Sequence, residues 1–147
     1  MKYLFIITTA LLLFLPSSAL ADAEKIFREN SKAVVVVISY DSEGNPIGQG
    51  SGFVVREDGA IVTNYHVISD AVDIKIKAGD KIFAVKGLLH IDKESDVVML
   101  KADAKGFLSV KIGDISKENI GEKVYVISSP QEFENTISDG ILSGIRE

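Results

Sequence analysis

Residues 51–63 read SGFVVREDGAIVT, two short apolar runs separated by the turn-forming residues Glu57-Asp58-Gly59. An Asp-Gly pair between apolar runs is a strong local signal for a β-hairpin, because glycine accepts the positive φ that tight turns need. We therefore predict strands at 51–56 and 60–63, joined by this turn. The hairpin indicates a β fold, and the segments on either side of it should contribute further strands.

Strand signals continue on both sides of the hairpin. Residues 33–40 read AVVVVISY, a β-branched run that is expected to be buried on both faces. Residues 41–48 are rich in turn formers and predict a loop. Further strands are predicted at 72–77, 81–91 with a bulge at Gly87, 96–101, 122–128 and 136–145, and a crossing segment at 101–113. About eight short strands with frequent turns and no long helix predict an all-β barrel or sandwich.

The N-terminus has the pattern of a secretory signal peptide over residues 1–21. Lys2 supplies a positive charge, residues 4–15 are almost entirely apolar, and an A-x-A site ends at Ala21. We predict cleavage between Ala21 and Asp22, followed by a short helix or arm over 22–32. An uncleaved membrane anchor is the alternative, but the apolar run is short for a membrane span.

Composition narrows the classes of function. The chain has 147 residues, 46 % hydrophobic and 25 % charged, which is the balance of a globular protein. Its net charge of −5 argues against nucleic acid or an anionic membrane as a partner. An exported chain without cysteine has no disulfides, so its core must be stable by packing alone. This favours a periplasmic or secreted bacterial protein.

Two titratable residues stand beside predicted strands. His66 follows the apolar run 60–62 in the sequence TNYHV, where a lone histidine is usually an ordinary strand-end residue. Asp96 opens the apolar strand DVVML, and a carboxylate buried there needs a partner. If the two residues pair, Asp96 fixes the imidazole tautomer and leaves the other ring nitrogen free as a base. The alternative for Asp96 is a plain surface residue before a strand.

Three motifs occur in the order G-x-G-S-G-F-V-V at 48–55, D-G-x-I-V-T-N-x-H-V-I at 58–68 and S-D-V-V-M-L-K at 95–101. Together they resemble the trypsin-like serine endopeptidases, most closely the HtrA/DegP type. Weaker similarity continues in I-G-E-K-V-Y-V-I at 120–127 and T-I-S-D-G-I-L-S-G at 136–144, while S-S-P at 128–130 departs from the family pattern.

The resemblance implies an all-β, chymotrypsin-like double barrel. In this reading the first barrel is complete over 33–105 and the second is only begun over 106–147. The resemblance also implies that His66 is a general base and Asp96 its orienting carboxylate. Family members of this type act on unfolded or misfolded polypeptides in the periplasm. A homo-oligomer is implied for the full-length form, without nucleic acid or a stable membrane anchor.

The family's nucleophile has no counterpart in this sequence. It lies in a G-x-S-G-G motif after the acid, and no such motif occurs in residues 1–147. Ser143 is the one serine after Asp96 with a neighbouring glycine, and the family pattern gives that position a structural role. Ser51, between two glycines, matches another non-nucleophile position and is expected to serve a turn and packing. Because the missing loop also supplies oxyanion donors, this chain is predicted not to cleave peptides.

Three accounts of the missing block are open: a fragment of an endopeptidase, the product of an interrupted gene, or a short pseudoprotease. A pseudoprotease would be a non-catalytic module that binds a peptide or a partner, for example by strand addition.

The second histidine, His90 in LLHID, raises the possibility of a zinc site with His66 and either Asp92 or Asp96. No H-x-x-x-H or H-E-x-x-H spacing supports it, so we predict no metal and no cofactor. His90 is predicted to be a strand residue. The loosely spaced glycines at 44, 48, 50 and 52 follow no phosphate-loop pattern and are expected to serve turns.

Overall fold

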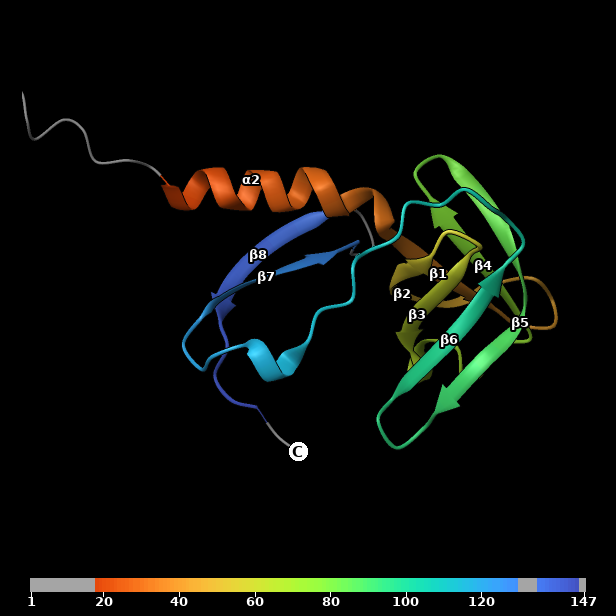
Figure 1. Cartoon of the computed structure of the whole chain (residues 1–147). Helices are drawn as coiled ribbons and strands as arrows, with labels where there is room; N and C mark the ends of the chain where they lie inside the picture. The colour runs from red at the N-terminus through yellow and green to blue at the C-terminus, as the bar shows by residue number, and fades with distance from the viewer. Residues whose placement is uncertain (1–17, 130–134, 146–147) are drawn as a thin grey trace, which may run out of the picture.

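The structure is a computed structural model, and it describes residues 18–129 and 135–145 (Figure 1). It contains a closed barrel, a two-stranded sheet and an N-terminal helix that lies beside this sheet. The helix is α2 (Ser18–Asn30), and the barrel strands are β1 (Val34–Tyr40), β2 (Pro46–Arg56), β3 (Ala60–Asn64), β4 (Asp73–Ala78), β5 (Lys81–Asp92) and β6 (Val97–Ala102). The second sheet consists of β7 (Lys123–Ser128) and β8 (Thr136–Ile141).

The barrel closes in the order β1-β2-β3-β6-β5-β4, and every neighbouring pair of strands is antiparallel. The predicted hairpin is confirmed, because Val54 of β2 faces Ile61 of β3 and the turn residue Gly59 has a φ of 90°. The predicted bulge at Gly87 is also confirmed by a shift of register in β5. The fold is therefore all-β, as the sequence predicted.

The barrel is filled by fully buried aliphatic side chains from every strand except β5, whose Phe83 and Val85 pack against this core while partly buried. The largest fully buried ones are Val35, Val37, Val54, Ile61, Ile76, Val98 and Leu100. The prediction that residues 33–40 are buried on both faces was wrong. Burial alternates along β1, with one face in the core and the other half-buried, because a barrel strand presents successive side chains to opposite sides.

The loop predicted at 41–48 is shorter than expected. β2 begins at Pro46, so the loop covers only 41–45, where Asp41 Oδ1 accepts backbone hydrogen bonds from Glu43 and Asn45. The glycines at 48, 50 and 52 consequently lie within β2, which corrects the expectation that they serve turns. Gly44, with a φ of 83°, does lie in the turn.

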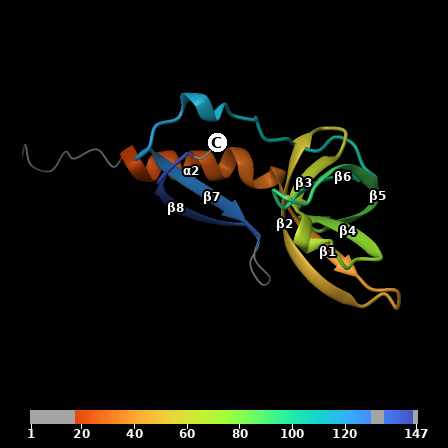
Figure 2. The ribbon, with the colours of Figure 1, turned by 90° about the horizontal axis from the view of Figure 1, so that it is seen from below.

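A long connection leads from β6 to the second sheet, as predicted for the crossing segment. It contains a short 3-10 turn at Ile115–Lys117 and ends at β7, which pairs with β8 from Ser128 opposite Thr136 to Lys123 opposite Ile141. Figure 2 shows this sheet beside α2 and apart from the barrel. The arrangement matches a chymotrypsin-like fold with a complete first barrel and part of a second.

The helix extends further than the predicted short helix or arm at 22–32. It begins at Ser18, so it continues across the predicted cleavage position after Ala21. Residues 1–17 of the predicted signal peptide lie outside the described residues, and the cleavage stays a prediction. Within 18–129 and 135–145, no helix is both long and apolar enough to cross a membrane.

Polar side chains join the helix region, the barrel and the second sheet. Ser51 Oγ on β2 accepts a hydrogen bond from the backbone N–H of Ser129 at 2.9 Å. Ser129 Oγ donates to Asn135 Oδ1 at 2.7 Å, and Asn135 Nδ2 donates to the carbonyl of Ser31 at 3.0 Å. Ser51 therefore sits within a strand and anchors the second sheet, whereas the sequence predicted a turn position for it.

Candidate active site

His66 lies in a 3-10 turn, Tyr65–Val67, that directly follows β3. The sequence placed it at the strand end, whereas the strand stops at Asn64 and the turn carries the ring away from the sheet. Ser39, which is buried inside the barrel, donates its hydroxyl hydrogen to the carbonyl of Val67 at 2.5 Å. The turn is therefore tied to the barrel interior through its last residue.

Close packing against the backbone of β2 also fixes the turn. Val67 packs directly on Gly50 of β2, where a Cβ atom would lie 2.6 Å from Val67 Cγ2. Any side chain at this position would clash with the turn that bears His66. Gly50 in the motif G-x-G-S-G thus has a packing role beside His66, which the sequence did not predict.

Asp96 follows a charged turn and directly precedes β6. Within this turn Asp92 Oδ1 accepts the backbone N–H of Ser95 at 3.0 Å. Asp96 itself has a φ of 55°, a left-handed conformation that is uncommon outside glycine and more accessible to Asp and Asn than to other residues. The Lys93 ammonium lies 5.0 Å from the ring centroid of Tyr65, so the two turns also touch through side chains.

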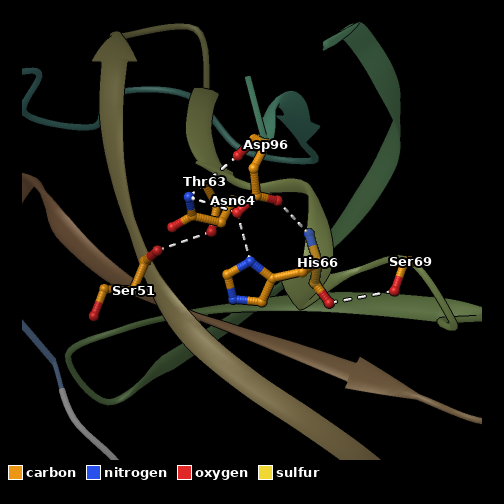
Figure 3. Close-up of polar contacts among 6 residues, drawn as sticks. All are labelled: Ser51, Thr63, Asn64, His66, Ser69 and Asp96. Carbon is orange, nitrogen blue, oxygen red and sulfur yellow. Dashed lines mark hydrogen bonds and ion pairs between the residues drawn. The ribbon is translucent and has the colours of Figure 1, made fainter. Parts of the chain in front are cut away.

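The structure brings His66 and Asp96 together (Figure 3). His66 Nδ1 lies 2.6 Å from Asp96 Oδ2, and the backbone N–H of His66 donates to Asp96 Oδ1 at 2.8 Å. These contacts lower the pKa of Asp96; the backbone hydrogen bond has the largest effect, followed by the ring hydrogen bond. The carboxylate therefore stays ionised at neutral pH and accepts hydrogen bonds with both oxygens.

The pairing determines what the imidazole can do. An ionised carboxylate is an acceptor only, so neutral His66 carries its hydrogen on Nδ1 and has a free electron pair on Nε2. The ring is 71 % exposed, and within the described part of the chain no group hydrogen-bonds to Nε2. A base with an open nitrogen is the arrangement that can take a proton from a bound hydroxyl or water.

His66 is one of the residues that line a cavity of about 190 Å³. Ser39, Ile47, Gly48, Gln49, His66, Val67, Asp70 and Ala71 line it. Its walls thus come from β1, from the start of β2 and from the turn around His66. A chain bound there would lie directly beside the base.

No serine hydroxyl within the described ranges forms a hydrogen bond with the His66 ring. Ser69 Oγ donates to the backbone carbonyl of His66 at 3.3 Å, and Ser143 Oγ donates to the carbonyl of Ile141 at 3.4 Å. Ser143 follows β8 and lies in no strand. Both hydroxyls therefore make local backbone contacts and do not complete a triad with His66.

His90 is confirmed as a strand residue, opposite Met99 in the β5–β6 pair. Among residues 18–129 and 135–145, no group of three or more His, Cys, Asp or Glu side chains is arranged to hold a metal. The prediction of no metal and no cofactor stays a prediction.

Comparison with known proteins places this chain in a family. A model of the trypsin-like peptidase domain matches residues 50–147. The chain belongs to the trypsin-like peptidases and, as its relatives show, to their HtrA/DegP type.

The most similar relatives include a probable periplasmic serine endoprotease DegP-like of Pseudomonas putida. It is 39 % identical over 94 residues, which cover 64 % of this chain and 20 % of that protein. The anti-sigma-I factor RsgI9 of Acetivibrio thermocellus is 33 % identical over 117 residues, 78 % of this chain and 16 % of that protein. The solved serine endoprotease from Yersinia pestis has a TM-score of 0.75 and 30 % identity, covering 88 % of this chain and 46 % of that one. The chain thus spans about a fifth of the DegP-like relative's length.

Proposed function

We propose that this chain is the N-terminal part of a periplasmic serine endopeptidase that hydrolyses peptide bonds in misfolded proteins. His66 is its general base and Asp96 the carboxylate that orients the base. The observation that carries the proposal is the 2.6 Å contact between His66 Nδ1 and Asp96 Oδ2, made while Nε2 stays open. The periplasmic location is supported by the signal-peptide pattern of residues 1–21.

The proposed mechanism follows from the charge states of the pair. His66 Nε2 takes the proton of a serine hydroxyl as that hydroxyl attacks the scissile carbonyl carbon. The imidazolium that forms is stabilised by the ionised Asp96, which keeps its charge throughout. His66 then gives the proton to the leaving amine, and a water molecule repeats the sequence to release the acyl group.

The serine and the oxyanion donors of this mechanism belong to a G-x-S-G-G motif that residues 1–147 do not contain. We therefore propose that the 147-residue chain by itself does not hydrolyse peptides. In the same scheme residues 1–21 are the signal peptide, 22–32 an N-terminal arm or short helix, 33–105 the first barrel and 106–147 the start of the second.

The test begins with DNA sequencing of the source locus through codon 147. Where the reading frame continues into a G-x-S-G-G motif, the encoded protein is assayed with casein as wild type, His66→Ala, Asp96→Asn and His90→Ala. We expect losses of about 10³-fold or more for His66→Ala and Asp96→Asn, since the base or its correct tautomer is lost. His90→Ala is the matched histidine control and keeps wild-type activity. A His66→Ala protein as active as wild type contradicts the proposal.

A second candidate function applies where the frame ends at codon 147. The chain would then be a non-catalytic pseudoprotease that binds a peptide or a partner. Apolar side chains of the β7–β8 sheet favour it, because Val126 and Ile141 are 58 % and 63 % exposed and are available to a binding partner. The similarity to a protein named as an anti-sigma factor adds support. This candidate requires a soluble, folded, exported product that begins at Asp22, and recovery of aggregated chain alone contradicts it.

A further inference from the structure

Asn64 lies at the last position of β3, directly before the turn that carries His66. Its amide nitrogen Nδ2 lies 3.1 Å from the backbone carbonyl oxygen of Asp96 and 3.2 Å from its carboxylate oxygen Oδ2 (Figure 3). We propose that Asn64 is a positioning residue whose amide holds both the backbone and the carboxylate of Asp96 for pairing with His66. This inference rests on the proposed function of that pair.

The backbone of Asp96 is in a conformation that needs support. Its φ of 55° is sterically unfavourable for a residue with a Cβ atom, so neighbouring groups must hold it there. Two donors converge on its carbonyl oxygen: the backbone N–H of Tyr65 at 3.1 Å and the Asn64 amide. Both donors come from the chain around the His66 turn, so they fix Asp96 relative to the base.

The carboxylate of Asp96 is held from two directions. The backbone N–H of His66 fixes Oδ1, whereas Oδ2 is the oxygen that contacts the imidazole ring. Asn64 adds a contact with Oδ2 from β3, where the Asn64 backbone pairs with Val97 in the barrel. Because the barrel fixes β3, the amide gives the carboxylate a reference that does not move with the imidazole.

The chemical consequence is control of the His66 tautomer. With Oδ2 held in place, the hydrogen of neutral His66 stays on Nδ1 and Nε2 stays free. The amide also stabilises the ionised form of Asp96, and its side-chain hydrogen bond is among the causes that lower the pKa of Asp96, after those from His66. The hydrogen bonds of the Asn64 amide go to Asp96 and not to His66 Nε2, so Asn64 acts on the base through Asp96.

The test measures the imidazole and the carboxylate directly by NMR of the full chain labelled with ¹⁵N and ¹³C. The ring ¹⁵N shifts of His66 at mildly alkaline pH report the tautomer ratio, and carboxyl ¹³C shifts report the pKa of Asp96. For Asn64→Ala we expect a smaller share of the Nδ1–H tautomer and a raised pKa of Asp96, because a hydrogen bond to its ionised form is lost. Asn64→Asp, which keeps the size but replaces the donor with an acceptor, is expected to raise that pKa further.

A matched control is available in Asn119, whose Nδ2 donates to Glu122 Oε1 at 2.7 Å. Asn119→Ala removes the same kind of amide-to-carboxylate bond elsewhere and is expected to leave the His66 tautomer and the Asp96 pKa unchanged. If Asn64→Ala does not fold, Asn64→Asp carries the test, because amide spectra show whether each variant keeps the native fold.

Asp96→Asn separates the two proposals. If it leaves the His66 tautomer ratio unchanged, the pairing itself is absent in solution and the proposed function fails. If Asp96→Asn alters the ratio while Asn64→Ala and Asn64→Asp both retain the wild-type ratio and the wild-type Asp96 pKa, only the role of Asn64 is overturned.

Discussion

Gly50 and Val67 are in contact so close that no side chain fits between them. A Cβ atom on Gly50 would lie 2.6 Å from Cγ2 and 3.1 Å from Cγ1 of Val67. Val67 ends the turn that presents His66, so the size of the residue at position 50 decides where that turn can lie. Gly50 thus affects the geometry of the site although it has no functional side chain.

Gly50→Ala is expected to destabilise the chain by about 1–3 kcal/mol, since the added methyl group must push Val67 and its turn outward. Urea unfolding followed by circular dichroism measures the change. Gly48→Ala, two residues earlier in the same strand, is the matched control. A Cβ there meets only the Val67 carbonyl oxygen at 4.0 Å, so its effect should be small. Equal stabilities of the two variants would refute the packing argument.

Ser39→Ala is expected to cost about 1–2 kcal/mol, because the Val67 carbonyl loses the buried hydroxyl that donates to it. The same variant should increase hydrogen exchange in the Tyr65–Val67 turn, which loses its anchor to β1. Ser69→Ala is the comparison, since Ser69 is exposed and its 3.3 Å bond to the His66 carbonyl is weak. Its change in stability should lie within about 0.5 kcal/mol of zero. A Ser39→Ala protein that matches Ser69→Ala would show that the hydroxyl anchors nothing.

Much of the barrel could be predicted from the sequence, because strand signals are local. A strand can be predicted without knowing which strand it pairs with. Examples are the strands beside the Asp-Gly turn, the alternating residues 72–77 and the apolar start of β6. The start of β2 could not be predicted, since the glycines at 48–52 look like turn residues, whereas its end at Arg56 was predicted. They are strand residues because they pair with β1, and Gly50 is in addition packed against Val67 of a turn that is distant in sequence.

Part of the candidate site could also be predicted from local sequence motifs. Motif resemblance pointed to His66 and Asp96, and the structure places them in contact. Asn64 lies in the TNYHV motif, but the motif predicts no role for its side chain. Its contact depends on the left-handed backbone of Asp96, which brings the Asp96 carbonyl within reach of the amide. The sequence carried one signal for this, an amide side chain two residues before the histidine.

Asp58 should make the stability of the hairpin pH-dependent. Hydrogen bonds from Arg56, and then from Lys101, lower the pKa of Asp58 from 3.8 to about 2. A carboxylate whose pKa is lower in the folded state stabilises the fold above its unfolded pKa, so this contribution is present above about pH 4. It is lost as the pH falls from about 4 to about 2, where the carboxylate is protonated in both states.

Urea unfolding of wild type and Asp58→Asn at neutral and at strongly acidic pH measures this contribution. Asp58→Asn is expected to be less stable than wild type at neutral pH, and the difference should shrink towards pH 2. Asp80→Asn is the control, because Asp80 has no hydrogen bond or ion pair within the described residues. If the difference in stability between wild type and Asp58→Asn were the same at pH 2, the effect could not come from the charge of the carboxylate.

Asn135 is expected to hold the second sheet against the helix region through two side-chain hydrogen bonds. It accepts from Ser129 Oγ and donates to the Ser31 carbonyl, while its backbone has a φ of 42° that Asn and Gly adopt more readily than Ala. Asn135→Gly loses both bonds and keeps the backbone conformation, at a cost of about 1–2 kcal/mol. Asn135→Ala loses the bonds and adds backbone strain, so it should cost about 1 kcal/mol more. Hydrogen exchange at Ser129 should quicken in both variants, while exchange in the barrel strand β6 should not. Exchange that rises equally in β6 would mean that Asn135 supports the whole fold and not this junction.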